Sequence, residues 1–266
     1  MLQLTDRVGA NVSLFEPLEP RCLLSGAPES YNLMSLLGYD RRGASWKYNT
    51  IATYVDLDDQ TTTRSQSTKV NIATAQAKFD GQLSNVVKFY GPDVTLTSAW
   101  YSNSKGTFQS LSFTSGAIGE LNITLHDTKI APKSMVVGQT YHDTGTFDGR
   151  INDDVLGESL TGTFSGNDTV TSGLSRHQTI RTKAGSYDAI KGSYEVTVTG
   201  KLKLNIAGET INVDFSANQN TVFWAVPNVG VAKHITSATV TYQAPDQDPF
   251  STKLDETSSL ASYVLP

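Results

Sequence analysis

The fold is decided by the stretch Lys183 to His234. It begins Lys183-Ala-Gly-Ser-Tyr-Asp-Ala-Ile-Lys191 and ends Phe223-Trp-Ala-Val-Pro-Asn-Val-Gly-Val-Ala-Lys-His234. Between these ends, apolar and polar residues alternate along 194–199, 201–206 and 211–215. Alternation with a period of two is the pattern of a β-strand that buries one face. The stretch therefore predicts antiparallel strands joined by tight turns.

The same pattern extends over most of the chain of 266 residues. Strand-like runs recur from Trp46 to Tyr242, separated by Gly, Pro, Asn and Asp clusters, and we predict turns or corners at Gly166-Asn-Asp168 and at Gly200. Helical spacing is confined to a short segment near 31–38. We predict an all-β protein with one or two curved, open, half-barrel-like antiparallel sheets and at most a short helix near 31–38.

Composition narrows the classes of function. The net charge is −5 and the charges are scattered, so no basic stripe favours binding of nucleic acid. Cys22 is the single cysteine, and an internal disulfide is therefore excluded. No apolar run is long enough for a transmembrane span, and none is predicted.

Three short blocks recur in the same order along the chain, which suggests an internal duplication. The second copy is longer, and its extra residues fall in predicted turns, where insertions cost least. Chance similarity between short β segments is the alternative. The matching pairs are 43–48 with 138–143, 77–80 with 185–188, and 99–106 with 223–230.

The duplication predicts two related β modules flanked by less ordered segments. The first residues, with two prolines and no continuous apolar run, predict an extended leader, and the proline- and acid-containing C-terminus predicts a flexible tail. The predicted organisation is a leader or tag over 1–30, a first module over 31–126, a link over 127–134, a second module over 135–242 and a tail over 243–266.

The leader contains the segment Leu18-Glu-Pro-Arg-Cys-Leu-Leu24. Pro17 and Pro20 prevent a regular helix and hold the segment extended, as in a recognition tag. It resembles the Leu-Glu-Pro-Arg-x-Leu-Leu signature near the N-termini of many exported or surface proteins of planctomycetes and some proteobacteria. The resemblance implies export, with sorting machinery as a partner. The predicted targeting residues are Leu18, Glu19, Pro20, Arg21, Leu23 and Leu24.

No arrangement of residues predicts catalysis or a metal site. The four histidines lack a second ligand at metal-binding spacing, and no nucleophile or phosphate-binding motif is present. Acidic turns at Asp56, Asp58 and Asp59 and at Asn152 to Asp154 offer oxygen ligands for Ca²⁺ but lack the spacing of an EF-hand. We predict no enzyme, no catalytic residue and no cofactor.

Aromatic residues are the remaining candidates for a functional site, because they occupy equivalent positions in the repeated blocks. One interpretation is core packing. The other is that some of them line the concave face of a curved sheet, beside the 31–38 segment, and bind an apolar ligand. The predicted ligand-binding residues are Trp46, Tyr48, Trp100, Tyr101, Phe223 and Trp224.

The order of these blocks resembles bacterial envelope proteins with a lipoprotein-carrier-like half-barrel. Gly138, Tyr141, Ala184 to Asp188 and Trp224 to Lys233 carry the resemblance, whereas the sequence predicts less helix than those proteins have. It implies a half-barrel fold and a setting in the cell envelope, periplasm or cell surface. We expect a non-enzymatic exported protein that binds an apolar, lipid-like or polymeric envelope component. The alternative is a structural or adhesive surface module without a small-molecule ligand.

Overall fold

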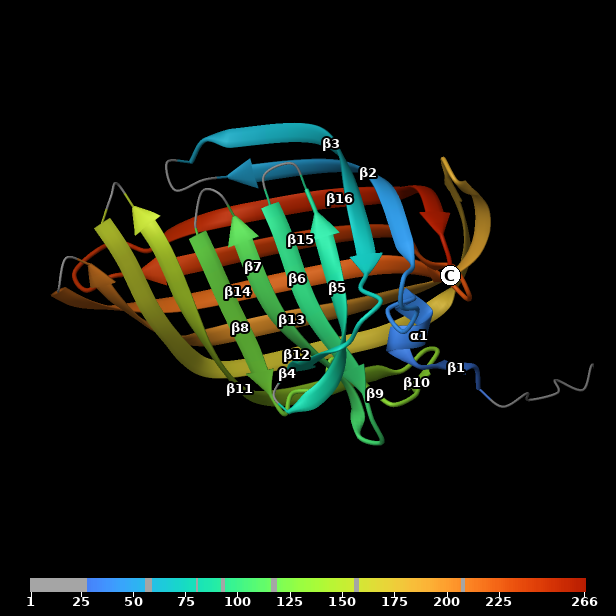
Figure 1. Ribbon diagram of the computed structural model, residues 1–266, viewed down its shortest axis with the longest axis horizontal. Coiled ribbons are helices and arrows are strands. Elements are labelled where there is room, and N and C mark those ends of the chain that lie inside the picture. The colour runs from blue at the N-terminus through green and yellow to red at the C-terminus, as the bar shows by residue number, and fades with distance from the viewer. Residues whose placement is uncertain are drawn as a thin grey trace, which may run out of the picture.

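The computed structural model describes residues 28–55, 59–79, 81–91, 94–115, 119–155, 158–206 and 209–266. In these ranges, long antiparallel strands curve around one short helix, which confirms the predicted fold class (Figure 1). The elements are β1 Ser30–Tyr31, α1 Leu33–Leu37, β2 Ser45–Val55, β3 Thr61–Ile72, β4 Ala77–Phe79, β5 Gln82–Tyr90, β6 Val94–Ser102, β7 Gly106–Ser115, β8 Gly119–His126, β9 Ala131–Pro132, β10 Met135–Val136, β11 Thr140–Val155, β12 Glu158–Thr182, β13 Gly185–Ile206, β14 Glu209–Val226, β15 Gly230–Gln243 and β16 Phe250–Val264.

One continuous sheet contains the strands of both predicted modules. Its order is β3-β2-β16-β15-β14-β13-β12-β11-β8-β7-β6-β5-β4, and all of its strand pairs are antiparallel. A short ladder between β3 and β5, of four residue pairs from Lys69–Tyr90 to Ile72–Val87, brings the two sides of the curved sheet together at one end. The half-barrel is therefore joined along part of its length.

The prediction of a flexible tail over 243–266 was wrong. Residues 250–264 form β16, which pairs with β15 on one side and with β2 on the other. The prolines and acidic residues that suggested a tail lie in 245–249, in the turn before this strand. Within the strand, Leu254, Ser258 and Leu260 alternate with more exposed residues, as expected for a half-buried strand.

The two predicted modules follow the same path in the sheet. The strands β2, β3, β5, β6, β7 and β8 each pair with the next, as do β11 to β16, the last of which lies beyond the predicted second module. The two halves meet where β8 pairs with β11 and where β16 pairs with β2. Gly43 and Gly138, which precede the first strand of each half, have φ angles of 87° and 88°. This correspondence fits a duplication, although the duplication and the module boundaries, including the link 127–134, stay predictions.

Two glycines predicted as turns or corners lie inside long strands, so that prediction was wrong. Gly166 in β12 pairs directly with Gly200 in β13. A Cβ atom on Gly166 would lie 2.0 Å from the Thr199 carbonyl oxygen, and one on Gly200 would lie 2.3 Å from that of Ser165. The missing side chains therefore let the two backbones approach closely at this pair.

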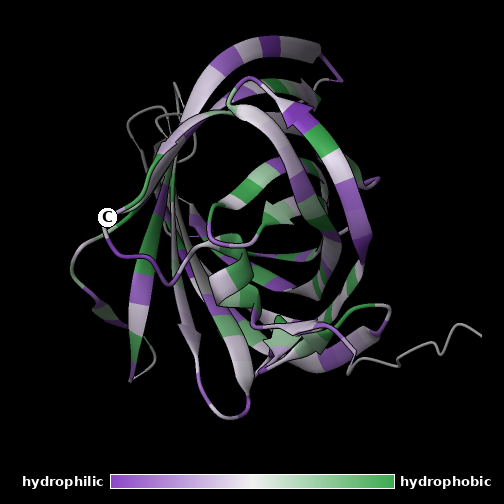
Figure 2. Ribbon diagram, turned by 90° about the vertical axis from the view of Figure 1, so that its right-hand side faces the viewer, coloured by the Kyte–Doolittle hydropathy of each residue, from purple (hydrophilic) through white to green (hydrophobic). Residues whose placement is uncertain are grey.

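Helix α1 lies inside the curve of the sheet and packs against its concave face (Figure 2). The Asn32 side chain accepts a hydrogen bond from the Ser35 amide at 3.2 Å, and Gly38 ends the helix with a φ of 80°. Four of the five helical residues, all except Ser35, are buried. The helix thus fills one end of the half-barrel with an apolar core.

We expect the change Gly166→Ala to lower the free energy of unfolding by about 1–3 kcal/mol, because the new methyl group collides with the backbone of β13. Urea unfolding followed by circular dichroism measures this loss. Gly173→Ala on the same strand is the control, since its nearest neighbour, the Gln139 carbonyl oxygen, is 3.2 Å away. An equal loss in both variants would refute the close approach of β12 and β13.

Candidate ligand-binding face

Three of the six predicted ligand-binding residues belong to the core around α1. The Trp46 indole packs against Gly38 and donates a hydrogen bond from Nε1 to the Val229 carbonyl oxygen at 2.7 Å. Trp100 donates from Nε1 to a serine hydroxyl on its own strand at 2.8 Å. Both tryptophans and Phe223 are 1% exposed. Their contacts fit the core-packing interpretation.

Two further predicted residues lie on the opposite face of the sheet, because neighbours on a strand point to opposite sides. Tyr101 follows Trp100 and stacks on Phe108 at 4.8 Å between ring centroids. Trp224 follows Phe223, and its Nε1 donates to Gln178 at 2.9 Å. A ligand-binding role for the six aromatic residues stays a prediction.

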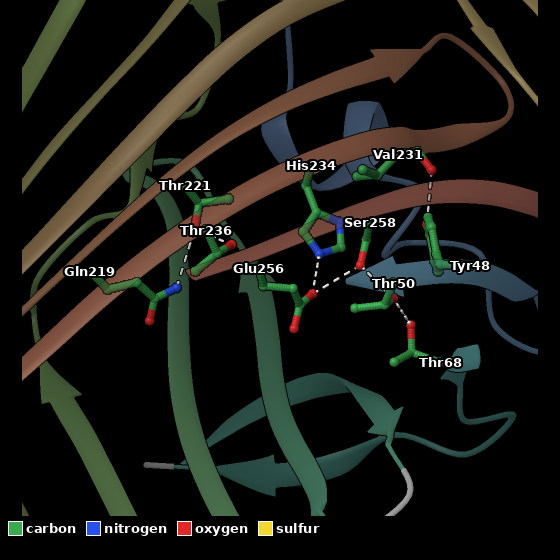
Figure 3. Close-up of polar contacts among 10 residues, drawn as sticks. All are labelled: Tyr48, Thr50, Thr68, Gln219, Thr221, Val231, His234, Thr236, Glu256 and Ser258. Atoms are coloured by element: carbon green, nitrogen blue, oxygen red, sulfur yellow. Dashed lines mark hydrogen bonds and ion pairs between the residues drawn. The ribbon is translucent and has the colours of Figure 1, made fainter. Parts of the chain in front are cut away.

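Tyr48, the sixth residue, begins a layer of polar side chains on the concave face (Figure 3). Its hydroxyl donates to the Val231 carbonyl oxygen at 2.8 Å. Next to it, the Thr50 hydroxyl lies 2.7 Å from the hydroxyl of Ser258 and 2.7 Å from that of Thr68. Thr50 and Ser258 are 1% and 0% exposed, so their hydroxyl groups satisfy one another inside the protein.

His234 and Glu256 form the charged part of this polar layer. His234 Nε2 lies 2.9 Å from Glu256 Oε1, which also accepts a hydrogen bond from the Ser258 hydroxyl at 2.9 Å. Burial raises the pKa of the Glu256 carboxyl, but His234 and Ser258 outweigh it, so the pKa lies below its ordinary value of 4.5. The two side chains are 19% and 23% exposed, and solvent reaches both.

The strand register places the polar layer on the concave face. Trp46, Tyr48 and Thr50 share one side of β2, and Trp46 contacts the end of α1. Thr50 pairs with Ser258, and Ser258 pairs with His234. Directly paired residues point to the same side of a sheet, so the whole layer faces the same interior as the helix.

Beyond the polar layer, the concave face becomes apolar and only partly covered. Ala217 pairs with Val240, and Phe215 pairs with Tyr242, on the side that His234 occupies. All four side chains are half-buried. Phe215 also packs edge-to-face against Phe147, with the ring centroids 5.7 Å apart. Along the strands, the face therefore passes from a closed apolar core through a polar layer to apolar residues that solvent reaches.

Sequence reasoning missed Glu256 and Ser258, because it treated their segment as a tail. The signal that could have found them is the alternation of Leu254, Glu256, Ser258 and Leu260 over one side of a strand. It also missed that histidines pair with carboxylates across neighbouring strands. His126 Nε2 lies 2.9 Å from Asp148, and His177 contacts both Glu29 and Asp188.

Two acidic segments, at 56–59 and 152–154, offer oxygen ligands for Ca²⁺, although the sequence predicts no cofactor. Asp56 and Asp58, like the targeting segment 18–24, lie outside the described residues. Asn152 to Asp154 belong to β11 and form part of a strand. Within the described ranges, no group of three or more His, Cys, Asp or Glu side chains is arranged to hold a metal ion.

A separate cavity of about 170 Å³ lies between the turn after β6 and the start of β11. Lys105, Lys129, Tyr141 and Asp143 are among its lining residues. Asp143 accepts a hydrogen bond from the Lys129 amide at 2.7 Å and pairs with its ammonium group at 3.5 Å. Because this carboxylate already has partners within the protein, the cavity is a weaker candidate than the concave face.

Comparison with known proteins adds little to this description. No protein-family model matches the chain, and no curated protein is significantly similar to it. Two crystal structures match over 84% of the chain, each at 11% identity. One is a candidate exported protein with a YmcC-like fold from Bacteroides fragilis, covered over 96% of its length with a TM-score of 0.23. The other is a candidate lipoprotein from Parabacteroides distasonis, covered over 95% with a TM-score of 0.24.

TM-scores this low support no conclusion about this chain. The fold assignment therefore rests on the strand pairing described above. In the part of the chain that the structure describes, none of the helices is both long and apolar enough to cross a membrane.

We expect Glu256→Gln to lower the free energy of unfolding at pH 7 by about 1.5–3 kcal/mol, because a charged hydrogen-bond acceptor is lost. A carboxyl with a lowered pKa stabilises the fold above its ordinary value of 4.5 and loses this effect as the pH falls through the folded-state pKa. Urea unfolding at pH 7 and pH 3 should therefore show a smaller loss at pH 3.

Asp214→Asn is the matched control for this measurement. Asp214 pairs with Lys201 at 2.7 Å on the surface, where both side chains are more than half exposed. Exposed pairs of this kind contribute about 0–1 kcal/mol, so the control should change little at either pH. A loss in Glu256→Gln that is equal at pH 7 and pH 3 would contradict the assigned role of the Glu256 charge.

Proposed function

We propose that this protein is a non-enzymatic binding protein of the cell envelope that holds a lipid-like ligand on the concave face of its sheet. The observation that carries the proposal is the order of surfaces along that face. A polar layer around His234 and Glu256 borders half-buried apolar residues at Ala217, Val240 and Phe215. A molecule with a polar head and an apolar chain is complementary to this order.

The dimensions of the face suit such a ligand. Thr236 pairs with Glu256 in the polar layer, and Tyr242 lies six residues further along β15 on the same side. Six residues of a strand span roughly 20 Å, which is enough for a long alkyl chain. The polar groups at the inner end are largely hydrogen-bonded to one another, so the fold does not depend on a ligand to satisfy them.

Export to the envelope is supported by the resemblance of 18–24 to the sorting signature of exported proteins. Sorting machinery that recognises Leu18 to Leu24 is the partner that this proposal requires. Export is also compatible with the single cysteine, because a large core folds without disulfide bridges.

A structural or adhesive surface module is the second candidate, and one observation favours it. Ile51 and Ile235 lie on the convex face, each paired with Thr257 of β16, and are 56% and 37% exposed. Apolar side chains that lie in one row on an outer surface can contact another protein. Binding of a ligand on the concave face would leave this row unaffected.

We expect the purified protein to bind the uncharged apolar fluorophore N-phenyl-1-naphthylamine, with a rise in its emission. The change Ala217→Glu should weaken this binding by about tenfold or more, because it places a charge among apolar side chains. Fluorescence titration measures the affinity, and circular dichroism establishes that the variant is folded.

Ser216→Glu is the matched control, since Ser216 neighbours Ala217 and points to the convex side, where it is exposed. It should bind the fluorophore like the unchanged protein. Absence of binding in the unchanged protein, or equal weakening in both variants, would reject the concave face as a lipid-like site and favour the surface module.

A further inference from the structure

We infer that the ligand on the concave face carries an ammonium group, which the Glu256 carboxylate binds as its counter-ion. The inference rests on the proposed function and names the chemistry of the ligand's polar end. Glu256 Oε1 already accepts two hydrogen bonds, from His234 and Ser258. Glu256 Oε2 accepts none from the described residues, and the side chain is 23% exposed (Figure 3).

The surrounding groups also favour a hydrogen-bond donor as ligand. Gln219 donates through Nε2 to the Thr221 hydroxyl at 3.3 Å, which leaves its carbonyl oxygen as an acceptor on the same face, two strands from Glu256. The Thr221 and Thr236 hydroxyls lie 3.1 Å apart and share one hydrogen bond. An ammonium group has three donors and no acceptor, so it matches the carboxylate oxygen of Glu256 that lacks a donor.

The negative charge of Glu256 on the concave face also favours a cationic ligand. Hydrogen bonds from His234 and Ser258 keep the pKa of Glu256 below its ordinary value, so the carboxyl is ionised at neutral pH. The basic side chain Arg64 lies in the same row, with Ala52 between it and Glu256. Two strand spacings separate the backbones of Arg64 and Glu256 by about 10 Å, and the ion-pair partner of Glu256 among the described residues is His234.

An anionic head group would meet the opposite situation. A carboxylate, sulfate or phosphate placed against Glu256 Oε2 would bring two negative charges together with no proton between them, which disfavours binding. A neutral head group with hydroxyls would be accepted without the gain from charge. The expected order of affinity for equal alkyl chains is therefore ammonium, then neutral, then anionic.

The test uses amphiphiles that share one alkyl chain and differ in the head. Dodecylammonium, dodecyl maltoside and dodecanoate, each below its critical micelle concentration, compete with bound N-phenyl-1-naphthylamine at pH 8. We expect dodecylammonium to bind about tenfold or more tightly than dodecanoate, as one charge-assisted hydrogen bond provides.

The change Glu256→Gln should reduce this preference to about twofold or less, and circular dichroism establishes that the variant is folded. Asp255→Asn is the matched control, because Asp255 is exposed on the other side of β16 and its loss should leave the preference intact. Thr236→Lys is a second variant, which places a cation opposite Glu256 and should abolish the preference even if Glu256→Gln is unstable.

Each outcome separates the two proposals. Failure of the fluorophore and of all three amphiphiles to bind would reject the lipid-like site itself. Binding of the three amphiphiles with equal affinity, or a preference that survives both Glu256→Gln and Thr236→Lys, would overturn the ammonium inference and leave the site standing. A preference for dodecanoate would also overturn it.

Discussion

The rest of the structure depends on the insertion of β16 between β15 and β2. This strand joins the last part of the chain to the first, so that Thr50 and Ser258, 208 residues apart in sequence, share a hydrogen bond in the interior. Without β16, β2 and β15 would each have an unpaired edge. Glu256 and Ser258 also come from this strand. The polar layer therefore forms only when β16 pairs with β15 and with β2.

Close approach of β12 and β13 is the second requirement, and glycines permit it. Gly166 and Gly200 face each other in β12 and β13, where a side chain on either would collide with the opposite backbone. The sheet bends enough to enclose α1, whose apolar residues fill one end. This arrangement leaves the other end for half-buried side chains, with the polar layer between them. Buried polar groups in such a position are stable because they satisfy one another.

The sequence pattern predicted the strands, but it contained no signal for the pairing that forms the polar layer, for physical reasons. Alternation is a local signal, and it identified the sheet and the short helix closed by Gly38. Glycines within strands carry the same local signal as glycines in turns, so Gly166 and Gly200 were misplaced. The aromatic pairs were conspicuous in the sequence, yet Trp224 and Phe223 point to opposite faces. His234 and Glu256 meet only through the pairing of β15 with β16, which no local spacing reveals.

The two sides of the half-barrel are held together unequally. The β12–β13 ladder runs from Thr161–Asn205 to Thr182–Gly185, whereas β3 and β5 share only four residue pairs at one end. Local opening of a native protein begins where the fewest hydrogen bonds must break. The β3–β5 ladder is thus a short closure of the sheet, and its separation would expose Val70, Ile72 and Val87, which belong to the same apolar core as α1.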